Sequence, residues 1–243
     1  MKRVVLLVLA ALGTAGLIGL GVWQLERRVW KLALIERVEQ RVHAAPIAAP
    51  GPAQWPSLDR DNAEYLRLSA TGQFLQNRPA FVQAVTTLGA GFWVMAPFQT
   101  DAGFIVLVNR GFVTPEQRDS VARAGYGGVP AAPVADTAEQ AAGRLTLTGL
   151  LRMTEPNGGF LRANVPADDR WYSRDVAAIS HAQHLSGTAP YFIDADASPR
   201  AGQVPVGGLT VVAFRNSHLL YAITWFTLAL MVGALGVRIS RQR

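Results

Sequence analysis

The sequence contains no cysteine, which excludes disulfide bonds, zinc–thiolate centres, Cys-x-x-Cys redox sites and a cysteine nucleophile. Charged residues are also scarce, at 16% of the 243 residues, whereas hydrophobic residues make up 50%. A mean hydropathy of +0.18 excludes a disordered or highly solvated protein and is high for an ordinary soluble domain. The length allows one or two domains. The next question is therefore where the apolar residues lie.

The net charge of +6 does not indicate nucleic-acid binding, because the positive excess is confined to the two ends of the chain. Residues 1–44 carry a net charge of +4, residues 45–215 carry −1 and residues 216–243 carry +3. The large middle segment is thus close to neutral. We expect no nucleic-acid partner.

Two uncharged runs predict membrane-spanning helices. Residues 4–23 contain no charged side chain, and neither do residues 219–237. At about 1.5 Å per helical residue, each run spans a hydrocarbon core of about 30 Å. Small residues recur at four-residue spacing (Ala11, Ala15, Gly19 and Ala229, Gly233). They either let the two helices approach closely or reflect ordinary membrane-helix composition.

The charges that flank these runs predict the topology. Three arginines follow the second run, so its C-terminus should face the cytoplasm, and the middle of the chain should face the periplasm. The first run could instead be a cleaved signal peptide, but it is longer than the usual apolar core and no small-residue cleavage site follows it. We therefore expect a multi-pass protein of the inner membrane, in contact with the lipid bilayer.

The predicted organisation has six parts. They are a cytoplasmic N-terminus (1–3), a transmembrane helix (4–23), a juxtamembrane helix and linker (24–56), an extracytoplasmic β-rich domain (57–215), an interfacial start with a transmembrane helix (216–237) and a cytoplasmic tail (238–243). The fold class is thus a membrane-anchored α+β protein, in which two transmembrane helices flank one antiparallel β-rich domain, a small barrel or sandwich-like.

Within the middle domain, apolar runs bounded by turn residues predict strands. The strands are expected at 65–74, 80–86, 92–98, 104–113, 144–152, 191–194 and 209–214. Residues 99–103 predict a hairpin between two of them. A helix is expected at 173–184 with Ser173 as its N-cap. Residues 125–142 are rich in Gly, Pro and Ala, which predicts a long surface loop.

No familiar catalytic motif is present. The sequence lacks H-E-x-x-H, G-x-S-x-G, a Walker loop and G-x-G-x-x-G. His181 and His184 have the spacing of two metal ligands on one helix face, but no third ligand lies near them, so we favour an exposed helix end. Asp169 and Asp175 could serve a hydrolase, but the charges around Trp171 are better explained as ion pairs at an aromatic anchor.

His218 is the last ionisable side chain before the second apolar run. Polar residues at such a boundary are costly and are more often functional than surface residues. On a helix, His218, Tyr221 and Trp225 share one face. A neutral imidazole beside aromatic rings suits axial ligation of an amphiphilic porphyrin. The alternative is an interfacial histidine bonded to the backbone or to a lipid headgroup.

Several motifs, in order along the chain, resemble the Surfeit-locus (Shy-type) family of cytochrome c oxidase assembly factors. Residues 216–226 (NSHLLYAITWF) resemble the N-x-H-L-x-Y-A-x-T-W-F signature of that family. Residues 21–24 (GVWQ), with Arg27, Lys31 and Leu34, resemble its exit from the first span. Further matches are residues 108–113 (VNRGFV), 155–157 (EPN) and 171–175 (WYSRD). One departure is Phe112, where the family usually has Trp.

The resemblance implies a membrane factor, not an enzyme, that helps to mature haem–copper oxidases. It implies haem a as bound cargo, with His218 as the iron ligand and with Tyr221 and Trp225 along the porphyrin. Arg110 either contacts a haem propionate or forms a structural salt bridge. The implied partner is the oxidase catalytic subunit, and the haem a synthesis machinery is a further candidate. The alternative is a chaperone that stabilises an oxidase assembly intermediate and binds no haem.

Overall fold

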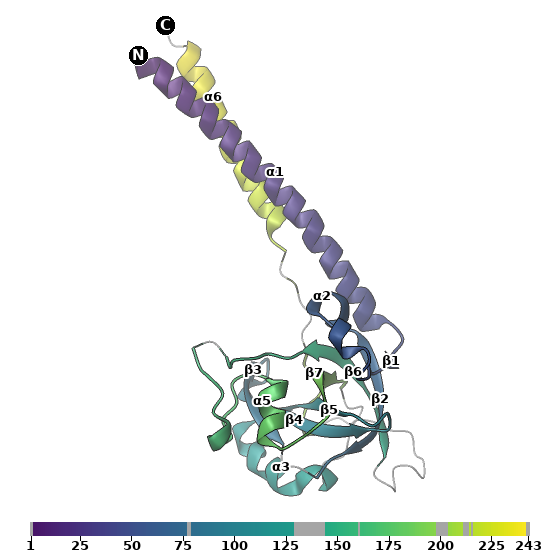
Figure 1. The fold of residues 1–243 in the computed structure, drawn as a ribbon. Coiled ribbons are helices and arrows are strands. Elements are labelled where there is room, and N and C mark those ends of the chain that lie inside the picture. The colour runs from purple at the N-terminus through teal and green to yellow at the C-terminus, as the bar shows by residue number, and fades with distance from the viewer. Residues whose placement is uncertain are drawn as a thin grey trace. The chain divides into compact units, whose positions relative to one another are not determined.

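The computed structural model describes residues 2–76, 79–128, 144–159, 161–197, 204–210, 214 and 216–241. The chain divides into two compact units, a helical unit (Met1–Gln40 with Val212–Arg243) and a barrel unit (Arg41–Val211). Apolar helices near both ends of the chain flank a single β-rich domain (Figure 1), which confirms the predicted fold class.

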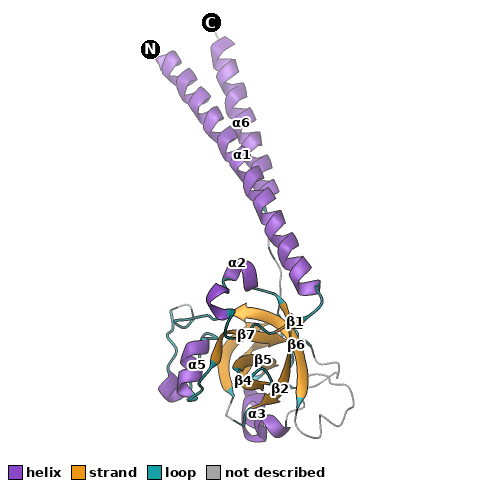
Figure 2. Cartoon of the chain, turned by 45° about the vertical axis from the view of Figure 1, so that its right-hand side comes forward, coloured by secondary structure: helices purple, strands orange, loops and turns teal. Residues whose placement is uncertain are grey.

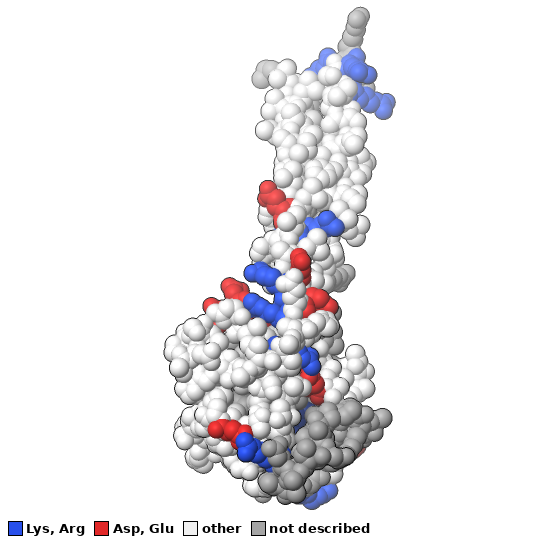
Figure 3. All heavy atoms as spheres, turned by 90° about the vertical axis from the view of Figure 1, so that its right-hand side faces the viewer, with Lys and Arg blue, Asp and Glu red and all other residues white. Residues whose placement is uncertain are grey.

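The helical unit contains α1 (Lys2–His43) and α6 (His218–Arg241), and both are long and apolar enough to cross a membrane. Most of their large apolar side chains are exposed, as expected for helices surrounded by lipid. Figure 3 shows a surface without charged groups along much of this pair, with Lys and Arg gathered at the end that holds the termini. Because α1 has 42 residues, it extends roughly 63 Å, about twice the hydrocarbon thickness.

One face of α1 is less exposed than the rest and follows a spacing of three and four residues, as in a coiled coil. From Leu7 onward these positions are Ala10, Thr14, Leu17, Gly21, Gln24, Arg28, Lys31 and Val38. A Cβ atom on Gly21 would lie 2.5 Å from Cε1 of Phe226, so the glycine allows that ring of α6 to pack against α1. Near the termini, the Arg3 guanidinium donates to the carbonyls of Ile239 and Ser240, at the end of α6.

Of the two interpretations of the small residues, close approach of the helices holds on α6, whereas ordinary membrane-helix composition holds on α1. Ala229 is buried, and a Cβ atom on Gly233 would lie 3.7 Å from Thr14. Ala11, Ala15 and Gly19 are all exposed. The contact face of α1 is therefore set by the three-and-four spacing, whereas a strict four-residue spacing drifts around the helix.

The described residues of the barrel unit form seven strands (Figure 2). They are β1 (Ile47–Ala48), β2 (Arg67–Phe74), β3 (Ala80–Thr86), β4 (Gly89–Thr100), β5 (Ile105–Val113), β6 (Leu145–Met153) and β7 (Thr188–Ala195). The order β2–β6–β7–β5–β4 closes on itself through a β2–β4 pairing, while β1 and β3 lie outside the closed set. The pairings are antiparallel except β1–β2 and β5–β7.

Apolar side chains fill the barrel and cover parts of its outside. The largest cluster includes Leu68, Phe98, Val106 and Tyr191, all fully buried. A second cluster packs α5 (Val176–Ala182) and Trp171 against the sheet. A third lies under α3 (Pro115–Gly128). The short elements are η1 (Trp55–Ser57), α2 (Arg60–Ala63) and η2 (Pro166–Asp168).

Most predicted strands and the 99–103 hairpin are confirmed, but three local predictions are wrong. Helix α3 was not expected, and it includes residues 125–128 of the predicted loop. Helix α5 begins after Asp175, which caps it, because the hydroxyl of Ser173 is buried against the side chain of Asn164. Residues 209 and 210 form no strand. The rest of that predicted strand at 211–213, and residues 129–142 of the predicted loop, lie outside the described residues.

Candidate functional site

His218 is the first residue of α6, and its ring faces α1. Its Nδ1 lies 2.8 Å from Oε1 of Gln24. An amide oxygen only accepts hydrogen bonds, so the imidazole donates from Nδ1. In the neutral ring this leaves the lone pair on Nε2, which is the form that binds a metal ion. Gln24 thereby fixes both the tautomer and the orientation of the histidine.

The chain just before His218 leaves one polar atom without a partner. Oδ1 of Asn216 is buried and accepts no hydrogen bond in the described part of the chain. Such atoms are rare in proteins, because an unsatisfied buried acceptor is costly. The acceptor lies two residues from the imidazole, within the N-S-H segment.

The two aromatic residues predicted beside His218 differ in their surroundings. Trp225 lies two turns further along α6, at a half-buried position on the face of His218. Tyr221 is 53% exposed and lies nearer the edge of that face. Alanines at 222 and 229 occupy the centre of the contact with α1.

Two basic residues continue the half-buried face of α1 beyond Gln24. Arg28 follows one turn later and Lys31 nearly two turns later. The Lys31 ammonium lies 4.8 Å from the ring centre of Phe214. Neither side chain forms an ion pair with a described residue. Positive charge therefore lies on the same face as the Gln24–His218 pair.

Arg110 lies on β5 in the barrel unit, whereas the other three predicted site residues belong to the helical unit. It is buried, and its guanidinium carbon lies 4.7 Å from the ring centre of Phe74. A contact between Arg110 and a haem carboxylate stays a prediction.

Asp194, which the sequence analysis did not single out, is the centre of a polar network on the barrel. Its side chain is 2% exposed and accepts hydrogen bonds from four side chains. These donors are Asn109 (2.8 Å), Arg152 (3.0 Å), Arg174 (3.1 Å) and Thr210 (2.9 Å). One carboxylate thus connects β5, β6, β7 and two connecting segments. The signal for it was a single acidic residue within an apolar strand, because a buried charge requires partners.

Arg174 also binds Glu155, so three of the motifs that carry the family resemblance meet in this network. Oε1 of Glu155 lies 2.5 Å from Nη2 of Arg174. Burial alone would raise the pKa of Glu155, but the hydrogen bonds and charge of Arg174, with Arg152, outweigh it and lower the pKa. Burial likewise opposes the charge of Arg152, but Asp194 and Glu64 raise its pKa. The network is a set of satisfied ion pairs, which stabilises the barrel.

The remaining candidates for catalysis or metal binding either have structural roles or lie in no cluster of metal-ligating side chains. Asp169 accepts a hydrogen bond from the indole of Trp171 at 2.7 Å, and Asp175 caps α5. His181 is exposed, and no cluster of three metal-ligating side chains occurs among the described residues.

Comparison with known proteins identifies the family. The model of the SURF1 family matches residues 11–230. Surfeit locus protein 1 of Mus musculus is 33% identical over 226 residues, covering 86% of this chain and 67% of the mouse protein. The Homo sapiens protein of that name is 32% identical over 228 residues (87% and 69%). A SURF1-like protein of Monosiga brevicollis is 32% identical over 238 residues (92% and 83%). The chain belongs to the SURF1 family, the Surfeit-locus family of cytochrome c oxidase assembly factors that its motifs resemble.

Proposed function

We propose that this protein is a cytochrome c oxidase assembly factor that binds haem a through His218 and hands it to the oxidase catalytic subunit. The family supports the role in oxidase assembly. The observation that carries haem binding is the hydrogen bond from Nδ1 of His218 to Gln24. A metal-ligating histidine usually donates its second ring nitrogen in this way, which orients the ring and raises its basicity.

The surroundings of His218 fit the parts of haem a. The iron needs one axial nitrogen, which Nε2 supplies. Arg28 and Lys31 suit the two carboxylates of the porphyrin, because neither is paired with a described acidic residue. The buried oxygen of Asn216 suits the hydroxyl group of haem a. Trp225 suits the flat face of the ring, and the apolar surface of the helices suits the long tail.

The proposed role needs binding and release but no catalysis. A carrier that passes its ligand on must not bind that ligand far more tightly than the acceptor binds it. His218 would hold the haem iron from a half-buried position, which is consistent with reversible binding. The proposed acceptor is the oxidase catalytic subunit, and the haem a synthesis machinery is a further proposed partner.

We place the barrel unit on the periplasmic side of the inner membrane. Arg238 and Arg241 follow the apolar part of α6, and positive residues mark the cytoplasmic side of a span. Lys2 and Arg3 lie at the same end of the helical pair, where Arg3 binds the end of α6. Fusions of a periplasm-dependent reporter to each terminus would test this orientation.

The test of haem binding is a visible spectrum of the full chain purified in detergent from cells that make haem a. We expect a Soret band in the unsubstituted protein and its loss in His218→Ala. His181→Ala is the matched control, because the side chain of that histidine is exposed on α5, and it should keep the band. Far-UV circular dichroism of each variant establishes that the helices and the barrel are retained.

The outcomes separate the two candidate functions. No Soret band in the unsubstituted protein would reject haem binding and support the chaperone that acts by protein contacts alone. A band of equal height in His218→Ala would reject His218 as the ligand.

A further inference from the structure

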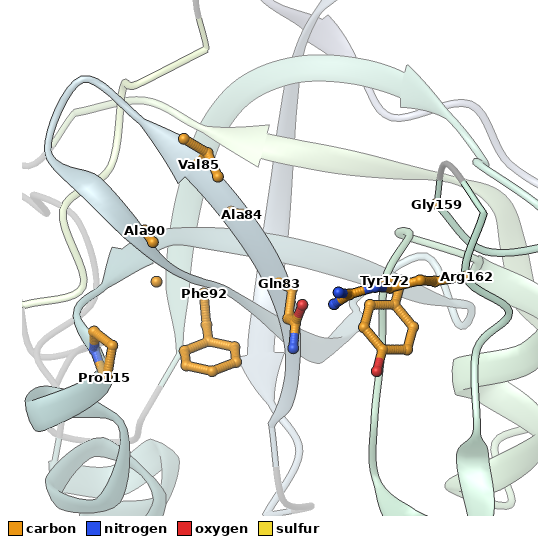
Figure 4. Close-up of a pocket in the computed structure, with 10 residues that line it drawn as sticks. Gln83, Ala84, Val85, Ala90, Phe92, Pro115, Gly159, Arg162 and Tyr172 are labelled. Atoms are coloured by element: carbon orange, nitrogen blue, oxygen red, sulfur yellow. The ribbon is translucent and has the colours of Figure 1, made fainter.

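A pocket on the barrel unit lies beside the edge of β3 that faces away from β4, where the segment of Trp171 pairs with Val82 and Gln83 but not with Val85. Its volume is about 440 Å³, and it lies between the β3–β4 hairpin, the start of α3 and the segment that carries Tyr172 (Figure 4). Its lining includes Gln83, Val85, Phe92, Pro115, Arg162 and Tyr172. It belongs to neither the His218 site nor the Asp194 network. We call it the β3 edge pocket.

The strand register shows which backbone groups face this side. Thr86 pairs with Gly89 across a two-residue turn, and the pair that flanks such a turn is hydrogen-bonded. Hydrogen-bonded pairs then alternate along the strands, so Thr86, Ala84 and Val82 direct their backbone groups toward β4. Gln83 and Val85 alternate with them and direct their backbone groups away from β4. The N–H of Gln83 already binds the carbonyl of Trp171 at 2.9 Å, which agrees with this alternation. The carbonyl of Gln83 and both groups of Val85 have no hydrogen-bond partner among the described residues.

Val85 in the pocket lining, and two apolar residues that lie close to lining residues along the chain, are unusually exposed. Val85 is 85% exposed, Leu88 in the following turn is 53% exposed and Leu161, next to Arg162, is 87% exposed. Only one other large hydrophobic side chain, Ile47, is exposed in the described part of the barrel unit. Three of the four large apolar side chains that are exposed in the described barrel unit thus belong to the pocket or to segments next to it, which favours an interaction site there.

The one charged side chain in the described lining of the pocket is positive. The guanidinium of Arg162 lies 5.4 Å from the ring centre of Tyr172, and it forms no ion pair with a described residue. Figure 4 shows its nitrogens directed toward Gln83. Arg118, on α3, lies 4.9 Å from the ring centre of Phe92 at the other side. The lining contains no acidic residue.

We propose that the β3 edge pocket binds an extended segment of another polypeptide, which adds a strand along β3 and pairs an acidic side chain with Arg162. An incoming strand satisfies the outward carbonyl of Gln83 and both outward groups of Val85 by main-chain hydrogen bonds, while pockets for alternate side chains give specificity. Lipid tails would cover Val85, Leu88 and Leu161 but would leave those backbone groups unsatisfied. The observations therefore favour a polypeptide, and the proposal is independent of haem binding.

The probe is the fluorescein-labelled peptide acetyl-Thr-Val-Glu-Val-Thr-Val-amide, with its Lys-for-Glu counterpart and a backbone N-methylated form. Binding to the full chain in detergent is measured by fluorescence anisotropy, with empty micelles as the blank. We expect saturable binding of the acidic peptide, and binding about tenfold weaker for the Lys peptide, the effect of losing one charge-assisted hydrogen bond. The N-methylated peptide should not bind.

Substitutions at two positions locate the binding to the pocket. Val85→Pro removes the outward N–H without breaking a bond to β4, because proline is tolerated at a solvent-facing edge position. It should lower affinity by about tenfold or more, whereas Val85→Thr, which keeps the N–H, should bind as the unsubstituted chain does. Arg162→Glu should reverse the preference between the acidic and Lys peptides.

Three results would overturn the proposal. The first is no saturable binding of either peptide by a folded chain. The second is equal binding of the N-methylated peptide, which would indicate apolar adsorption without strand addition. The third is displacement of the peptide by dihexanoylphosphatidylcholine with no effect of Val85→Pro, which would assign the surface to lipid. A normal Soret band in Val85→Pro and Arg162→Glu separates this test from that of haem binding.

Discussion

At the scale of single residues, two groups of buried or half-buried polar side chains differ in whether all their hydrogen-bonding atoms are used. Gln24 and His218 form a pair in which one ring nitrogen is used and the other is left for a ligand. Around Asp194, by contrast, four side chains donate to one carboxylate. A site that binds a ligand needs an unused group, whereas a set of satisfied ion pairs stabilises the fold. This difference is why we place function at His218.

Gln24 is expected to act as a positioning residue for His218. Gln24→Leu removes the acceptor for Nδ1, so the ring loses its fixed tautomer and orientation. We expect haem affinity to fall by about 10–100-fold, the usual effect of losing such a partner. Haem titration followed at the Soret band measures this change.

Gln24→Glu is the matched variant. It keeps an acceptor for Nδ1 and should retain binding while lowering the reduction potential of the bound iron, because a carboxylate makes the imidazole a stronger donor. Equal haem affinity in Gln24→Leu and the unsubstituted chain would remove Gln24 from the site.

Glu155 is expected to make stability depend on acid pH. The folded protein lowers its pKa below the ordinary value for glutamate of about 4.3. A lowered pKa means that the ion pair with Arg174 contributes fully above that ordinary value, and the contribution is lost as the pH falls through the folded pKa. Urea unfolding of the full chain in detergent should therefore show stability falling below about pH 4.3, and less steeply in Glu155→Gln.

Asp119→Asn is the control for this experiment, because Asp119 is exposed on α3 and forms no ion pair with a described residue. Its unfolding free energy should follow the unsubstituted chain at each pH. An unchanged pH dependence in Glu155→Gln would contradict the assigned role of the ion pair.

At the scale of elements, the close packing of α1 and α6 can be tested by cross-linking. A Cβ atom on Gly236 would lie 3.2 Å from Cβ of Ala10, near the 3.5–4.5 Å typical of disulfides. The double variant Ala10→Cys with Gly236→Cys should therefore oxidise readily. Because the chain has no native cysteine, non-reducing electrophoresis after protease cleavage between the helices reports this single bond.

The control is the double variant Ala11→Cys with Gly236→Cys, in which no disulfide bond is expected. Ala11 is exposed on another face of α1, so its thiol should not reach residue 236. Equal oxidation of both pairs would indicate that the helices rotate freely against each other and would contradict the packed face.

At the scale of the whole molecule, features set by local sequence could be predicted and features set by distant contacts could not. The apolar runs, the 99–103 hairpin and most strands follow from composition and turn residues, and the structure confirms them. Helix α3 was missed because residues 115–123 are mostly polar, and among those whose burial is described only Val121 is buried. The parallel β5–β7 pairing and the closing β2–β4 pairing join segments far apart along the chain, which periodicity alone does not reveal.

The candidate site likewise combines a residue that the local sequence indicates with a partner that only a distant contact supplies. His218 was found because its position before an apolar run is visible in the sequence. Its partner Gln24 lies 194 residues away, and only the packing of α1 against α6 brings the two together. Asp194 was missed because its hydrogen-bond donors are also distant along the chain, from Asn109 to Thr210, and only folding brings them together.

The position of β7 in the closed barrel has a kinetic consequence for the nascent chain. This strand lies between β5 and β6, yet it is the last of the seven to be synthesised. At about 5–20 residues per second, the ribosome needs roughly 2–7 s to pass from the end of β6 to the start of β7. During that interval two strand edges are open to mispairing. Synthesis of this protein therefore includes a short period in which the unfinished barrel can mispair, and a chaperone that covers the exposed strand edges would protect it.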